Sequence, residues 1–134
     1  MDLVIPLHPR TLARIAEFGL GGLLARPRVR ILEPIGYREM LSLTEAARFV
    51  ITDSGGIQEE TTFLGVPCLT VRENTERPIT VTHGTNTLVG RDFPLAWRTI
   101  DDIERGCYKK AKSIDGWDGH AAPRICRALV NAWS

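Results

Sequence analysis

The stretch from Phe49 to Pro78 limits the possible folds of this chain more than any other segment. Residues 49–51 are a short apolar run rich in β-branched side chains, which predicts a buried strand. A glycine turn at 54–56 follows at once, the next residues have helical spacing over 57–64, and 66–71 is a second apolar run. Strand, glycine turn, helix and strand in this order predict two parallel strands joined by a crossover helix.

The helix in this unit has a recognisable buried side and a recognisable end. Ile57, Thr61 and Leu64 are spaced as i, i+4 and i+7, so we expect them to face the sheet together. Gly65 stands where a helix ends in a left-handed residue, and Pro67 two positions later prevents the helix from continuing. The helix is therefore predicted to end at residue 64.

The turn Ser54-Gly55-Gly56 has the properties of an anion site. Free N–H groups at a helix N-terminus attract phosphate, and glycines let the backbone approach it closely. Glu60, one turn into the helix, could accept hydrogen bonds from the hydroxyls of a ribose, and Arg72 and Arg77 follow the next strand at the same edge of the sheet. The alternative is a tight connection with Ser54 as a simple N-cap. The sequence has neither a Walker loop nor a GxGxxG motif after a strand.

The rest of the chain alternates strand and helix patterns, which predicts an α/β fold with a parallel sheet covered on both faces. The glycines at 19–22 are expected to form a helix stop and a loop. The other expected strands are 3–5, 29–32 and 88–89, and the other expected helices are 11–18 with Thr11 as its cap, 37–47, 93–113 and 121–133.

Composition excludes several classes of protein. The chain has 134 residues, which predicts a single domain spanning 1–134, and its formal net charge of +1 gives no reason to expect nucleic acid or an acidic membrane as a partner. No apolar run approaches the roughly 20 residues that a membrane span requires, and no signal-peptide pattern opens the chain. The three cysteines and three histidines lack the spacing of a metal site, so we expect no metal, reduced thiols and a cytoplasmic location.

Several motifs, in their order along the chain, resemble the non-hydrolysing UDP-N-acetylglucosamine 2-epimerases. The resemblance covers essentially the whole chain. The matching motifs are PLHPRT at 6–11, TDSGGIQEE at 52–60, LGVP at 64–67, RENTERP at 72–78, GTN at 84–86, LVG at 88–90 and WDGHAAPRI at 117–125.

The resemblance implies a fold and a set of ligand contacts. The family has the two-domain GT-B architecture, and this chain looks like a partial carboxyl-terminal half, a Rossmann-like three-layer domain. Ser54, Gly55 and Gly56 then align with the diphosphate site, Glu60 with the ribose site, and Arg77 with an arginine facing the same cleft. Met40 aligns with a position beside the uracil, although it could equally be a core residue.

The resemblance also implies a reaction, and it leaves that reaction incomplete in this chain. The family removes the proton at C2 of UDP-GlcNAc and expels UDP, which adds back to give UDP-ManNAc, with no cofactor, in cell-envelope polysaccharide biosynthesis. The acid and base carboxylates belong to the other half, so no catalytic residue is assigned here. Glu59 and Glu60 are adjacent and point about 100° apart on a helix, which makes them a poor catalytic pair. Ile79 departs from the family, which usually has glutamate there.

Three functions stay open at this point. The chain could be the UDP-binding half of a 2-epimerase that is inactive alone, a non-catalytic module that binds a UDP-sugar or a protein, or the donor half of a GT-B glycosyltransferase. The expected partners are UDP or UDP-GlcNAc, together with the missing half or further copies of the chain. Apolar side chains of the last helix, Leu129 and Trp133 among them, are expected to be exposed.

Overall fold

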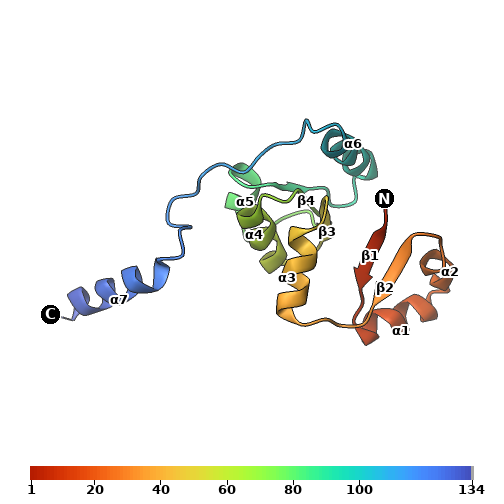
Figure 1. Cartoon of the computed structure of the whole chain (residues 1–134), viewed down its shortest axis with the longest axis horizontal. Coiled ribbons are helices and arrows are strands. Elements are labelled where there is room, and N and C mark those ends of the chain that lie inside the picture. Colours follow the sequence, from red (N-terminus) through yellow and green to blue (C-terminus); the bar gives the residue numbers. More distant parts are fainter. Residues whose placement is uncertain (134) are drawn as a thin grey trace. The chain divides into compact units, whose positions relative to one another are not determined.

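The computed structural model describes residues 1–133, and the chain divides into two compact units, Met1–Ser42 and a second that begins at Leu43 (Figure 1). Both units contain parallel strands and helices, which confirms the predicted α/β class. The expectation of one domain over the whole chain stays a prediction.

The first unit contains two parallel strands joined through helices. Strand β1 pairs with β2 over its whole length, with Leu3 opposite Val29. Helix α3 crosses the boundary between the units, because the division falls between Ser42 and Leu43. The elements that begin in this unit are β1 (Leu3–Pro6), α1 (Pro9–Glu17), α2 (Gly21–Leu24), β2 (Val29–Leu32) and α3 (Tyr37–Glu45).

Two expectations in the first unit are wrong in detail. The cap of α1 is His8 rather than Thr11, because Pro9 begins the helix and His8 Nδ1 accepts a hydrogen bond from the Arg10 N–H at 3.2 Å. Gly19 does end the helix, with φ of +65°. The following glycines are not all loop, since α2 begins at Gly21.

The second unit contains a three-stranded parallel sheet in the order β3-β4-β5 (Figure 1). Val50 lies opposite Cys68, and Cys68 lies opposite Asn86, so the three strands are in register. The elements of this unit are β3 (Val50–Thr52), α4 (Gly55–Leu64), β4 (Cys68–Thr70), α5 (Pro78–Thr82), β5 (Asn86–Leu88), α6 (Phe93–Glu104) and α7 (Ala121–Ala132).

The two faces of this sheet are chemically different. Leu69 packs with Val89 and with Ile103 of α6 in a buried apolar cluster. Successive side chains of a strand point to opposite faces, so the neighbours of Leu69, which are Cys68 and Thr70, face the side covered by α4. That side is mostly polar, because its fully buried residues include threonine, asparagine and glutamine.

This polar layer corrects the predicted buried side of α4. The residues that α4 buries are Gln58, Thr61 and Thr62, whereas Ile57 and Leu64 are only partly buried. The end of the helix is as predicted, with Gly65 in the left-handed region at φ of +73°.

One further helix boundary differs from the sequence expectation, and one helix was not expected. The helix predicted over 93–113 ends at Glu104, because Gly106 adopts φ of +72° and turns the chain away. Helix α5 lies where the sequence predicted no regular element, and Pro78 occupies its first turn. The last helix is present as predicted and buries none of its residues, with Trp133 87% exposed beyond its end.

Candidate functional site

The predicted anion site lies at the first turn of α4, and its glycines are not required by the fold. Gly55 and Gly56 have ordinary negative φ values, and an added Cβ would meet nothing within 4 Å at Gly55 and only Ser54 Oγ, at 4.0 Å, at Gly56. Alanine would therefore fit at both positions and would favour the helix more than glycine does. The backbone of this turn is open to an approaching group.

Ser54 occupies the N-cap position of α4 without capping the helix. Its backbone is extended, its side chain makes no cap hydrogen bond, and its N–H donates to Thr52 Oγ1 at 3.1 Å. The first N–H groups of a helix have no partner within the helix. The simple N-cap alternative therefore lacks its defining hydrogen bond, and the Ser54 hydroxyl is exposed beside the turn.

The loop that carries Arg77 leaves the sheet at the same edge as the glycine turn. Thr52 and Thr70 are opposite each other at the carboxyl ends of β3 and β4, and Val71 N donates to Thr52 O at 2.9 Å. Thr75, farther along this loop, donates its hydroxyl to Gln58 Oε1 of α4 at 2.6 Å. The structure thus brings together the turn and the arginine loop, as the parallel crossover predicted.

The side chain of Arg77 contacts α4 through the residue next to Glu60. Its Nε lies 3.2 Å from Glu59 Oε1, at a geometry that makes an ion pair rather than a hydrogen bond. Arg77 and Glu59 are each about two-fifths exposed. Glu60 is partly buried on the same helix and forms no ion pair among residues 1–133. The first turn and Glu60 therefore belong to α4, and the Arg77 side chain lies against the same helix.

Met40 belongs to a different part of the chain. It lies in α3, within the unit Met1–Ser42, and is partly buried. Its alignment with a uracil contact stays a prediction.

Sequence reasoning missed a buried polar network beneath this site. Asn86 Nδ2 donates to Gln58 Oε1 at 3.0 Å and to Thr80 Oγ1 at 3.1 Å, while Asn86 Oδ1 accepts from Thr70 Oγ1 at 2.6 Å. All four of these residues are fully buried. The available signal was a glutamine three positions before Thr61, on the side of α4 that faces the sheet.

A segment that follows α6 secures the far strand of the sheet. Tyr108 Oη donates to Thr85 O at 2.8 Å and lies 2.6 Å from Thr87 Oγ1, and burial raises the pKa of Tyr108 to about 12. Lys109 Nζ donates to Val81 O and to Asn86 O, and partial burial lowers the pKa of Lys109. Burial also raises the pKa of the Cys68 thiol in the strand beside it.

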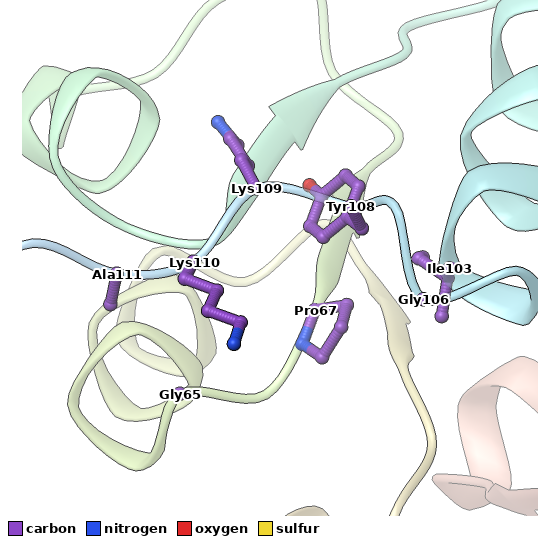
Figure 2. A pocket seen from close by; sticks show the side chains of 8 residues that line it. All are labelled: Gly65, Pro67, Ile103, Gly106, Tyr108, Lys109, Lys110 and Ala111. Carbon is purple, nitrogen blue, oxygen red and sulfur yellow. The ribbon is translucent and has the colours of Figure 1, made fainter.

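A pocket of about 420 Å³ lies at the end of this sheet opposite the glycine turn. Figure 2 shows Tyr108, Lys110 and Pro67 around it, while the Lys109 side chain points away. Gly65 and Pro67 precede β4, so the pocket is at the amino ends of the strands, away from the glycine turn.

Residues 1–133 contain no group of three or more potential metal ligands and no helix long and apolar enough to cross a membrane.

The fold and the site together define the class of protein. Parallel strands with a glycine turn at the carboxyl edge are typical of nucleotide-binding α/β proteins, and the similar solved structures are UDP-GlcNAc 2-epimerases, which have a GT-B-like fold. The family model of UDP-N-acetylglucosamine 2-epimerase matches residues 1–130. The chain belongs to this family.

Individual relatives agree with this assignment. A UDP-N-acetylglucosamine 2-epimerase of Methanocaldococcus jannaschii is 49% identical over 129 residues, which cover 96% of this chain and 35% of the relative. A UDP-2,3-diacetamido-2,3-dideoxy-D-glucuronate 2-epimerase of Pseudomonas aeruginosa is 46% identical over 131 residues, which cover 96% of this chain and 34% of the relative. The chain thus spans about a third of the length of these curated relatives, as expected for a carboxyl-terminal portion.

Solved structures show the same likeness. The crystal structure of the M. jannaschii UDP-GlcNAc 2-epimerase in complex with UDP-GlcNAc and UDP matches with a TM-score of 0.78 at 41% identity, covering 97% of this chain and 36% of that one. An S. aureus MnaA structure with UDP matches with a TM-score of 0.79 at 29% identity, covering 98% of this chain and 36% of that one. Both relatives were solved with UDP.

Proposed function

We propose that this chain is the UDP-binding portion of a nucleotide-sugar 2-epimerase, and that it is inactive without the acid and base residues of the remaining portion. In this proposal the whole enzyme interconverts UDP-GlcNAc and UDP-ManNAc by eliminating UDP and adding it back. The three cysteines are unpaired, which is consistent with a cytoplasmic location.

The observation that carries the proposal is the pair of glycines at the start of α4. Neither Gly55 nor Gly56 has a left-handed backbone or a crowded Cβ position, so the fold gives no reason for glycine at either site. A phosphate that approaches the free N–H groups does give a reason, because a Cβ would occupy its space. Ser54 adds a hydroxyl that makes no capping hydrogen bond. We therefore assign the diphosphate of UDP to Ser54, Gly55 and Gly56.

The remaining contacts are assigned to residues of three segments, α4, the loop before α5 and α3. Glu60 is the residue we assign to the ribose hydroxyls, since a carboxylate can accept two hydrogen bonds from vicinal hydroxyls. Arg77 supplies the positive charge for the diphosphate, held beside α4 by Glu59. Met40 is assigned to the uracil by the family resemblance. UDP is the part shared by the two nucleotide sugars in the names of the relatives, which supports UDP as the ligand of this portion.

A titration of the isotope-labelled chain with UDP, followed by NMR, tests the proposal. We expect shifts at Ser54–Glu60 and at Arg77, with affinity on the order of millimolar because only one wall of the site is present. Glu60→Ala should weaken these shifts more than Glu59→Ala, which leaves the ribose contact intact and removes only the ion pair with Arg77. No shift in the wild-type chain at several millimolar UDP would reject nucleotide binding and favour a protein-interaction module.

A further inference from the structure

The backbone of Arg77 is held at both of its polar groups by threonine hydroxyls. Its N–H donates to Thr75 Oγ1 at 2.9 Å, and its carbonyl oxygen accepts from Thr80 Oγ1 at 2.7 Å. Arg77 precedes the first residue of α5, where its own φ and ψ of −121° and 58° belong to no regular structure. These two hydrogen bonds therefore fix the backbone conformation of Arg77, which no helix or sheet hydrogen-bond pattern determines.

Each of these hydroxyls is fixed in turn by a buried amide. Thr75 donates to Gln58 Oε1 at 2.6 Å, and Thr80 accepts from Asn86 Nδ2 at 3.1 Å. Asn86 Nδ2 also donates to Gln58 Oε1 at 3.0 Å, so the two amides bind each other. Gln58 belongs to α4 and Asn86 to β5, so the network connects the helix that carries the glycine turn with the loop that carries Arg77.

The directions of these hydrogen bonds leave little freedom. The Thr80 hydroxyl uses its proton on Arg77 O, so it can only accept from Asn86. Asn86 must then direct its amide Nδ2 toward Thr80 and Gln58, and Gln58 Oε1 accepts from both Asn86 and Thr75. An acceptor in place of the Asn86 amide NH2 group would break its hydrogen bonds to Gln58 and to Thr80 at once.

Stability alone does not explain why this layer is polar. The opposite face of the same sheet is covered by Leu69, Val89 and Ile103. On the α4 face, Gln58 Nε2 is fully buried and has no hydrogen-bond partner within residues 1–133. A buried, unpaired amide N–H is unfavourable, and an apolar side chain would avoid that penalty.

We propose that Gln58 and Asn86 are positioning residues: they hold the backbone of Arg77 so that its guanidinium lies beside the first turns of α4, where the diphosphate binds. Neither residue contacts the nucleotide; both act through Thr75 and Thr80. The role in binding rests on the proposed function, whereas the role in fixing Arg77 can be measured without any ligand.

The first test follows the Arg77 amide by hydrogen exchange in the 134-residue chain. Gln58→Met and Thr75→Val should each speed exchange of this amide about tenfold beyond the change in global stability, because its acceptor is lost or released. Thr75→Ser retains the hydroxyl and should restore protection. Val89→Ala, on the apolar face, is the control for a general loss of stability. Protection at Arg77 that follows global stability in every variant would overturn the proposal.

The second test is a double-mutant cycle on UDP affinity. Gln58→Met or Thr75→Val should weaken UDP binding about fivefold in the wild-type background and have no further effect in an Arg77→Ala background. An equal loss in both backgrounds would show that these residues act through the turn or the whole fold, and would overturn the proposal. If the wild-type chain does not bind UDP, the proposed function fails, while the exchange experiment still decides whether Arg77 is positioned by this network.

Discussion

Arg77 Nε lies 3.2 Å from Glu59 Oε1, which places the arginine of the β4–α5 loop against the helix that begins with the glycine turn. Glu59 is adjacent to Glu60, but the two carboxylates point in different directions around α4. The two adjacent glutamates therefore have different roles, which the sequence alone does not distinguish. The Glu59 carboxylate orients Arg77, and the Glu60 carboxylate is left for the ligand.

Replacing Glu59 should affect ligand binding more than it affects stability. The ion pair is partly exposed, so Glu59→Gln should lower the free energy of unfolding by no more than about 1 kcal/mol. UDP affinity should change modestly, about two- to threefold, because Arg77 loses an orienting partner but retains its backbone contacts. Denaturant unfolding and UDP titration of the same variant check both values. A loss of several kcal/mol in stability would contradict this account of the pair.

Two glycine substitutions should have opposite consequences. At Gly84 an added Cβ would lie 2.3 Å from Thr62 Oγ1 and 2.5 Å from Thr80 O, so Gly84→Ala should destabilise the chain by about 2 kcal/mol. At Gly55 the same Cβ meets nothing within 4 Å, so Gly55→Ala should leave stability unchanged or slightly higher. We expect Gly55→Ala to lose UDP binding nevertheless. Thermal unfolding separates the two variants, and retained UDP affinity in Gly55→Ala would argue against a phosphate at this turn.

Tyr108 should make stability depend on pH in the alkaline range. Its pKa is raised from 10.0 to about 12 in the folded chain, mainly by burial, so the folded state keeps a proton that the unfolded state loses. The stabilisation is complete below pH 10 and disappears as the pH rises toward about 12. Tyr108→Phe should remove the part of the alkaline dependence that lies between pH 10 and about 12 and comes from Tyr108.

The absorbance of tyrosinate during an alkaline titration measures the same effect. The Tyr108→Phe variant is the reference, since it lacks only the buried phenol. An alkaline titration with no delayed component that is lost in Tyr108→Phe would contradict the burial of Tyr108.

The last helix should promote association of the isolated chain. Leu129 and Trp133 are 49% and 87% exposed, and apolar side chains in such positions favour contacts with other molecules. A chain carrying Leu129→Lys and Trp133→Ser should sediment as a smaller species than the wild type at high protein concentration. Phe63→Ser, which removes another exposed aromatic residue, is the control. Identical sedimentation of all three chains as monomers would reject the prediction.

Local sequence pattern predicts the strand, glycine turn, helix and strand of the second unit, together with the end of α4 at Gly65. These features depend on local periodicity and on backbone preferences of single residues, which neighbouring positions in the chain specify. The family resemblance added the assignment of the turn, Glu60 and Arg77 to one ligand.

The buried side of α4 and the contacts that hold Arg77 depend instead on packing between distant segments. The sequence pattern predicted Ile57, Thr61 and Leu64 as the buried side; Thr61 is buried as predicted, but Gln58 and Thr62 are buried with it rather than Ile57 and Leu64. Gln58 finds its partners in Thr75 and Asn86, 17 and 28 residues away along the chain. A buried glutamine is stable only where distant segments supply matching donors, and no local pattern records that match, because it arises when strand register and loop path bring those segments together.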